Sequence, residues 1–232
     1  MNELLSTTPH IDSYRRGIML NRLKNLSTTH LCDAYVDARL LSNEIKPISK
    51  CARMIGKVFT IRTDGDLLPV VKGLELAEAG SVLVIDTCKS PYAFVGELFA
   101  SASIKKKLAG IVVDGACRDI DAIRNLELPI FAKSICAKAG TKSKAGKTQV
   151  ELELSGIKVR PGEIMIGDEN GLVVLSDKEL AEIIDSAEAI QQKEDRALKA
   201  IRDGKNFIEL FNFDEHYNNI LLGKTSTFTW KI

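Results

Sequence analysis

Gly110-Ile-Val-Val-Asp-Gly-Ala-Cys-Arg-Asp119 is the stretch of sequence that decides the fold. Its β-branched residues predict a buried strand over 111–114, and a glycine follows that strand. Arg118 and Asp119 come next, so a cation and an anion stand just beyond the carboxyl end of the strand. In α/β proteins, ligands bind at this end of the strands. An arginine beside an aspartate there can hold a small anionic substrate and a metal ion together.

The flanking segments alternate between strand and helix patterns. The sequence predicts strands over 58–62, 81–86 and 129–133, and helices over 68–79, 97–108 and 120–125. The first 45 residues also predict helix, with Ser27 as the N-cap of a segment over 28–37.

The pattern becomes strand-rich after Gly140. Residues 149–154 alternate between polar and apolar, and Glu169-Asn170-Gly171 lies between two apolar runs, 164–168 and 172–175, as in a hairpin. A polar helix follows from Asp177 to about Arg202. Strand–helix alternation followed by strands predicts a compact α/β domain with layered sheets.

We expect one domain over residues 1–204 and an aromatic-rich extension over 205–232. The extension holds six of the chain's 13 aromatic residues. Such rings must be buried, either on the chain's own core or on a neighbouring subunit.

Composition excludes several classes of protein. Lysine and arginine total 32 against 31 acids, a net charge of +1, which gives no overall electrostatic basis for binding nucleic acid or an anionic membrane. No apolar run is long enough to span a bilayer, and the N-terminus does not look like a signal peptide. Five scattered cysteines without a Cys-x-x-Cys pair predict reduced thiols and a cytoplasmic protein. Lysines 138, 142, 144 and 147 form either a solvated loop or a local anion-attracting rim.

A second segment, Gly96-Glu97-Leu98-Phe99, opens the helix predicted over 97–108. The first amides of a helix lack intrahelical acceptors and carry the positive end of its dipole, so they can receive a carboxylate or enolate oxygen. We expect this helix start to lie beside Arg118 and Asp119. The structural alternative is that Asp119 caps the helix after it and Arg118 is simply exposed.

The acids of these segments predict roles in chemistry. Asp119 could bind Mg²⁺, which keeps most of its waters and needs few protein ligands. Glu97 and Asp86 could orient water or move protons. Arg118 could hold a carboxylate through two parallel hydrogen bonds.

The ordered motifs resemble the family that unites 4-hydroxy-4-methyl-2-oxoglutarate aldolases with the regulator of ribonuclease activity A proteins. The resemblance covers roughly residues 15–200. It is carried by Leu31-Cys32-Asp33-Ala34, Gly56, Gly80-Ser-Val-Leu-Val84, Gly96-Glu97-Leu98, Gly110–Gly115, Arg118-Asp119, Pro129-Ile-Phe-Ala132, Val159-Arg-Pro-Gly-Glu163 and Gly167–Val174.

This resemblance implies a β/β/α swivelling-domain fold, like phosphohistidine domains, assembled as a homotrimer or hexamer with sites between subunits. It implies a lyase that uses Mg²⁺ or Mn²⁺ to cleave a 4-hydroxy-2-oxo dicarboxylate to pyruvate and also decarboxylates oxaloacetate. Arg118 would hold the pyruvyl group, the amides of Leu98 and Phe99 its carboxylate, and Asp119 the metal.

The acid at position 97 departs from the family pattern. Glu97 stands where aspartate is frequent, which leaves its water-activating role open. Glu194 of an adjacent subunit is a candidate for supporting metal-bound water.

Other signals are weaker. Lys133, at a predicted strand end, could form a Schiff base with a 2-oxo acid. Residues 140–148 resemble a phosphate-binding loop but have the wrong glycine spacing and lead into a strand, so this interpretation is rejected.

Several further polar residues have ordinary structural explanations. A hairpin turn accounts for Asp168 and Glu169. We expect Cys117 to be a small packed residue, with a reactive thiol as the alternative. The histidines, at positions 10, 30 and 216, lie outside the motifs, so histidine triads and zinc sites are not expected.

Two rival functions remain beside the lyase. The first is a non-catalytic regulator that binds a ribonuclease or an RNA helicase. The second is the same chemistry on a different small acid, with the aromatic extension reshaping the site.

Overall fold

The computed structural model of the chain describes residues 17–231. The chain divides into two compact units, Met1–Ile184 and Asp185–Ile232. The boundary that the sequence predicts at residue 204 stays a prediction.

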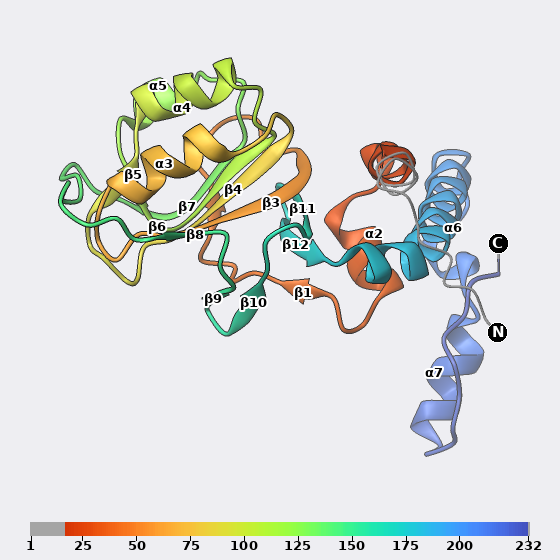
Figure 1. The fold of residues 1–232 in the computed structure, drawn as a ribbon. Coiled ribbons are helices and arrows are strands. Elements are labelled where there is room, and N and C mark those ends of the chain that lie inside the picture. The colour runs from red at the N-terminus through yellow and green to blue at the C-terminus, as the bar shows by residue number, and fades with distance from the viewer. Residues whose placement is uncertain (1–16, 232) are drawn as a thin grey trace, which may run out of the picture. The chain divides into compact units, whose positions relative to one another are not determined.

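A mixed sheet forms the centre of the first unit (Figure 1). Its strands are β1 (Arg39–Leu40), β2 (Lys46–Pro47), β3 (Met54–Arg62), β4 (Ser81–Asp86), β5 (Ala93–Val95), β6 (Gly110–Cys117), β7 (Ile130–Ile135), β8 (Lys147–Thr148), β11 (Ile164–Asp168) and β12 (Gly171–Leu175). They are ordered β1-β12-β11-β3-β4-β6-β7-β2, with β5 beside β6 and β8 beside β3. β9 (Leu152–Leu154) and β10 (Ile157–Val159) form a separate hairpin.

Strands β3, β4, β6 and β7 are parallel neighbours, and β5 joins β6 in parallel. Their apolar runs are buried on both faces, as a parallel sheet requires. On β4, Leu83 and Ile85 pack into one core and Val82 and Val84 into the other. Because β5 and β6 run in the same direction, the residues that follow them emerge at the same edge of the sheet.

Three helices cover one face of the sheet, as Figure 1 shows. They are α3 (Leu68–Leu76), α4 (Glu97–Lys105) and α5 (Ile120–Ile123). Against the other face, Leu152 and Leu154 of β9 pack with Met165 and Val174 of the β11–β12 hairpin. The predicted mixed α/β architecture, a curled sheet with flanking helices, is confirmed.

The N-terminal region departs from the prediction after residue 34. Residues 17–22 are helical, and η1 (Leu23–Asn25) and α2 (Thr28–Ala34) follow. Ser27 caps α2 as predicted, accepting a bond from the His30 amide while the His30 side chain accepts one from the Ser27 amide. Residues 39–45, predicted as helix, are not helical. Arg39–Leu40 form β1 because they pair with β12, and Lys46–Pro47 follow as β2, paired with β7.

The predicted strand over 149–154 is also shorter than expected. It begins only at Leu152, because the preceding residues are held over β3: the Gln149 amide donates to the Thr60 carbonyl at 2.9 Å. The Thr60 hydroxyl in turn donates to the Val150 carbonyl at 2.6 Å.

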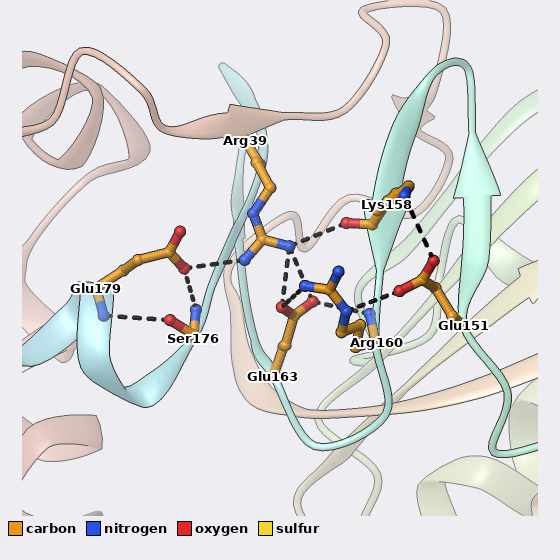
Figure 2. Close-up of polar contacts among 7 residues, drawn as sticks. All are labelled: Arg39, Glu151, Lys158, Arg160, Glu163, Ser176 and Glu179. Atoms are coloured by element: carbon orange, nitrogen blue, oxygen red, sulfur yellow. Dashed lines mark hydrogen bonds and ion pairs between the residues drawn. The ribbon is translucent and has the colours of Figure 1, made fainter.

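A network of ion pairs joins β1 to the β10–β11 turn and to the start of α6 (Asp177–Arg202), as Figure 2 shows. The Arg39 guanidinium lies 2.9 Å from Glu163 and 3.0 Å from Glu179. Glu179 also accepts the Ser176 amide at 2.6 Å, which closes a capping box at the start of α6. Glu163 is buried, so Arg39 neutralises a carboxylate that is largely removed from water.

The second unit contains the later turns of α6, η2 (Phe207–Leu210) and α7 (Phe213–Leu221). Its small core consists of Ala197, Leu210 and Phe211. The Phe211 ring centroid lies 4.7 Å from that of Phe228 and 4.4 Å from that of Trp230. Part of the aromatic extension is therefore buried on its own unit. Within residues 17–231, no helix is both long and apolar enough to cross a membrane.

Candidate active site

The residues after β5 and β6 meet at the edge of the sheet. The Arg118 amide donates to the Val95 carbonyl at 2.9 Å, and the Glu97 amide donates to the Asp119 carboxylate at 3.1 Å. These two bonds join the end of β6 to the start of α4. The predicted meeting of the two segments is thus present in the structure.

Asp119 has an unusual backbone. Its φ is 58° and its ψ is 43°, the left-handed region that residues other than glycine seldom adopt. It stands at the N-cap position of α5, yet its side chain makes no capping bond there and reaches α4 instead. The simple capping explanation for this aspartate is therefore wrong.

Gly96 allows the two segments to come this close. A Cβ atom at residue 96 would lie 2.4 Å from an Asp119 carboxylate oxygen and 3.0 Å from Arg118 Nε. Both contacts are too short, so either side chain would have to move.

We expect Gly96→Ala to lower kcat/KM for the lyase reaction that the family resemblance implies. The expected loss is about 100-fold, because displacing a reacting group by about 1 Å has that effect. The atoms that must move belong to partly exposed side chains, so the melting temperature should hardly change. Gly17→Ala is the control, since nothing lies within 4 Å of a Cβ at that position. Full activity in Gly96→Ala would show that the present placement of the two side chains is not needed.

A cavity of about 350 Å³ opens beside these residues. Gly96, Leu98, Phe99, Arg118 and Asp119 all contribute to its lining. The Arg118 and Asp119 side chains are each 42% exposed, and Arg118 Nε lies 3.5 Å from the Asp119 carboxylate. Both charged groups are therefore held in place yet reachable by a small molecule.

The start of α4 offers free hydrogen-bond donors to this cavity. The Glu97 amide is used by Asp119, and the first intrahelical bond runs from the Ala100 amide to the Gly96 carbonyl. Within the described residues, the Leu98 and Phe99 amides have no acceptor. Together with the guanidinium, they form a cluster of donors suited to a carboxylate.

The Glu97 side chain does not line the cavity. It is exposed, and the residue contacts the site through its amide alone. Its carboxylate is a surface group at the positive end of α4, a favourable place for an acid without any chemistry.

Sequence reasoning misses Asp66, a buried acid that joins two walls of the cavity. Its carboxylate accepts the Leu68 amide at 2.9 Å, the Thr141 hydroxyl at 2.6 Å and the Ser143 amide at 2.6 Å. Leu67 lines the cavity on one side of this junction and Ala139 on the other. An aspartate just before a helix start is a capping signal, but nothing in the sequence points to the bonds with residues 141–143.

Asp66 should make the stability of the protein depend on pH. Burial raises the pKa of its carboxyl, but bonds from the Thr141 hydroxyl and from the amides of Leu68, Ser143 and Lys144 outweigh this and hold the pKa well below its usual range. The stabilising effect is complete above the unfolded-state pKa of about 3.9 and is lost as the pH falls toward the folded-state value.

We therefore expect urea unfolding to show Asp66→Asn as less stable than the unmodified chain at pH 7. The gap between the two should narrow progressively below about pH 4. If the difference in unfolding free energy between the two proteins stayed constant across this pH range, the Asp66 carboxylate would not be the source of the pH dependence.

Two residues considered from the sequence lie elsewhere. Asp86 and Lys133 line a separate, polar pocket of about 550 Å³, together with Asp114. Lys133 pairs with Asp114 and lies 2.9 Å from the Ser155 hydroxyl. Asp86 is therefore not an acid of the Arg118 cavity, and a Schiff base at Lys133 would form outside it.

The remaining candidates have structural roles. Burial raises the pKa of the Cys117 thiol to about 12, so it is not a nucleophile. Asp168 accepts both the amide and the hydroxyl of Thr28 at 2.7 Å, which anchors α2 to the β11–β12 hairpin. Glu194 lies on α6 in the second unit and lines an apolar groove there. His10 lies outside the described residues.

The donor set limits what metal could bind. Within residues 17–231, no three histidine, cysteine, aspartate or glutamate side chains gather closely enough to hold an ion. At the cavity the chain offers one carboxylate, that of Asp119. This fits a hard ion such as Mg²⁺, which takes one or two carboxylates and completes its shell with substrate and water oxygens.

Comparison with known proteins identifies the family. The model of the RraA-like family, described as Aldolase/RraA, matches residues 28–174. This chain belongs to the RraA-like family. The matched segment includes every residue of the cavity described above.

Two relatives show how far the likeness extends. An uncharacterized protein of Methanocaldococcus jannaschii is 33% identical over 202 residues, covering 85% of this chain and 96% of that protein. The 4-hydroxy-4-methyl-2-oxoglutarate aldolase of Thermus thermophilus is 35% identical over 149 residues, covering 64% of this chain and 91% of that protein.

Two solved structures resemble much of the chain. The RNA-processing inhibitor RraA from Thermus thermophilus superimposes with a TM-score of 0.61 at 35% identity, covering 64% of this chain and 92% of that one. An uncharacterized protein of Pseudomonas syringae gives a TM-score of 0.73 at 27% identity, covering 82% of this chain and 95% of that one. Both an aldolase and an inhibitor thus occur among the relatives.

Proposed function

We propose that this RraA-like chain is a divalent-metal-dependent lyase that cleaves a 4-hydroxy-2-oxo acid of the 4-hydroxy-4-methyl-2-oxoglutarate type to pyruvate. One observation carries the proposal: Arg118, Asp119 and the free amides of Leu98 and Phe99 surround a single cavity. The name of the Thermus aldolase supports this reaction class.

The residues present divide the work of binding the pyruvyl half. The Leu98 and Phe99 amides bind its carboxylate. The Arg118 guanidinium, at the end of β6, binds the C2 oxygen of the pyruvyl group, which becomes the enolate oxygen. Asp119 would hold Mg²⁺ or Mn²⁺. When bound, such an ion supplies positive charge beside the oxygen on which negative charge develops.

Cleavage breaks the bond between C3 and C4 and leaves the electron pair on the pyruvate enolate. Arg118 donates to oxygens whose negative charge grows in the transition state, so its effect is catalytic and not only one of affinity. A base must remove the proton of the C4 hydroxyl. Because the Glu97 side chain does not line the cavity, we propose that its carboxylate takes this proton through a bridging water. Decarboxylation of oxaloacetate yields the same enolate, so one site would serve both reactions.

Assembly and location are part of the proposal. We expect a cytoplasmic homotrimer or hexamer with the β/β/α swivelling type of fold. The site would lie between subunits, and Glu194 of a neighbour would support metal-bound water.

The decisive assay measures pyruvate released from 4-hydroxy-4-methyl-2-oxoglutarate and from oxaloacetate, with Mg²⁺, with Mn²⁺ and with a chelator. The proposal expects release from both compounds that stops on chelation. If neither compound yields pyruvate with any metal, the chain is not this lyase.

A second candidate is a non-catalytic regulator that binds a ribonuclease or RNA helicase. It is supported by the RNA-processing inhibitor among the structural relatives. Pull-down with purified ribonuclease and helicase components separates the two candidates, because a lyase has no need to bind them.

A further inference from the structure

The polar pocket that contains Asp86 and Lys133 has no role in the proposed lyase reaction. Among the described residues, it shares no lining residue with the Arg118 cavity, and all of its lining belongs to the first unit. Its volume of about 550 Å³ lies within the range of pockets that take small molecules. It lies at the carboxyl ends of β4 and β6, where α/β sheets bind their ligands.

Four charged residues stand side by side on neighbouring strands of this pocket. Arg62 on β3 is in register with Asp86 on β4, and Asp86 is in register with Asp114 on β6. Lys133 follows on β7 and forms an ion pair with Asp114. In-register residues of parallel strands point to the same face of the sheet, here the face opposite the helices (Figure 1). The order across the sheet is therefore cation, acid, acid, cation.

The half of this row at Lys133 is already satisfied. The Lys133 ammonium pairs with Asp114 and lies 2.9 Å from the Ser155 hydroxyl. The Asp114 side chain is only 13% exposed, so the pair is held beneath the surface of the pocket. This half supplies a fixed floor and no free charge.

The half of the row at Arg62 is open to a ligand. Arg62 lies 3.6 Å from Asp64, but both side chains are about half exposed, and such pairs contribute little. One oxygen of Asp86 accepts the Cys88 amide at 2.7 Å. Within residues 17–231, the other Asp86 oxygen has neither a hydrogen-bond donor nor an ion-pair partner. A reachable cation thus stands beside an acid with a free oxygen.

Strained backbone shapes the rim of the pocket. Cys88, Lys89 and Ser155 all line it, with φ values of 55°, 58° and 51°. Residues other than glycine seldom adopt this conformation, and it is concentrated at sites that bind ligands. At the floor, a Cβ on Gly115 would lie 2.4 Å from Thr87 Oγ1, so glycine lets the loop after β4 pack on β6. The pocket is therefore a built feature of the fold.

We propose that the polar pocket binds a zwitterion of the α-amino acid class. Its carboxylate lies on Arg62 and Lys89, and its ammonium lies on Asp86, where it also relieves the repulsion between Asp86 and Asp114. Three cations and three acids line the pocket: Arg62, Lys89, Lys133, Asp86, Asp114 and Glu153. A ligand with a net charge would meet like charges in this neutral lining, whereas neighbouring ammonium and carboxylate groups each find a partner. The inference is independent of the proposed lyase function.

A binding experiment tests the class of ligand. A thermal-shift screen of the standard L-amino acids at millimolar concentration selects one, and calorimetry then compares it with two analogues. The α-amide lacks the anion and the 2-hydroxy acid lacks the cation, so each should bind at least about tenfold more weakly. If no amino acid binds, or if either analogue binds as tightly as the amino acid, the inference is wrong.

Three variants test the place of binding. Asp86→Asn keeps an oxygen for the Cys88 amide but loses the charge, and Lys89→Glu puts an acid beside the ligand carboxylate. Each should weaken binding of the selected amino acid at least about tenfold. Lys107→Glu is the matched control and should leave the affinity unchanged, because Lys107 is also exposed with a φ of 60° but does not line the pocket.

Three other outcomes would overturn the inference. Unchanged affinity in both Asp86→Asn and Lys89→Glu would place the amino acid elsewhere. Loss of binding in Arg118→Ala would place it in the Arg118 cavity. If Lys89→Glu, but not Lys107→Glu, breaks up an oligomer in light scattering, a neighbouring copy of the chain covers the pocket. Because binding is measured directly, a failure of the lyase assay leaves this inference standing.

Discussion

Arg118→Ala should lower kcat/KM for pyruvate release by about 100- to 1,000-fold, the scale found when one donor to a developing oxyanion is removed. The guanidinium lines the cavity beside the free amides of α4, and within the described lining it is the one cationic side chain. Most of the loss should appear in kcat, because the negative charge grows during cleavage. Steady-state kinetics with 4-hydroxy-4-methyl-2-oxoglutarate measure it.

Arg124→Ala is the matched control for this change. Arg124 is an exposed arginine at the end of α5, outside the cavity lining, and its removal should leave kcat/KM within about twofold. Size-exclusion chromatography should show the same assembly state for both variants. An Arg118→Ala protein with more than a tenth of the original kcat/KM would remove Arg118 from the mechanism.

Asp119→Asn should abolish the response of the lyase to metal and lower kcat by about 1,000-fold. The amide oxygen of asparagine can still accept the Glu97 amide, which Asp119 accepts at 3.1 Å, so the contact between β6 and α4 should persist. What the substitution removes is the negative charge. Titration with Mn²⁺, followed by its electron paramagnetic resonance signal, measures ion binding independently of turnover.

Asp121→Asn serves as the control, since Asp121 is an acid in the first turn of α5 that does not line the cavity. Its titration should match that of the unmodified chain. Unchanged Mn²⁺ binding in Asp119→Asn would show that the metal is held elsewhere, or that the chain does not bind it.

The central sheet could be predicted because its signals are local. The strands at 81–86 and 164–168 have the bounds that their apolar runs predict, and α6 begins and ends at Asp177 and Arg202 as expected. Both strands are largely apolar runs with buried side chains, β4 in the parallel part of the sheet and β11 in its antiparallel part. The position of Arg118 could be predicted because it follows such a strand. β5, the strand before Gly96, has only three residues, Ala93–Val95, and the sequence does not predict it.

Other features could not be predicted because they depend on residues far apart in the chain. β1 and β2 have two residues each and exist through their pairing with β12 and β7. Asp66 accepts the hydroxyl of Thr141, 75 positions later, and their backbones are bridged. The sequence predicts α3 only as a helix, and the place of its Val71 and Leu74 side chains in the lining of the Arg118 cavity appears only in three dimensions.

The left-handed backbone conformation of Asp119 lowers the stability of the protein at a residue on which the proposed activity depends. Glycine adopts positive φ without the strain that other residues incur, so Asp119→Gly would relax this turn. A selection for heat resistance alone would therefore favour glycine here and discard the carboxylate. Aspartate at this position keeps the carboxylate that bonds to α4 and that the proposed metal site uses, at a cost in backbone strain.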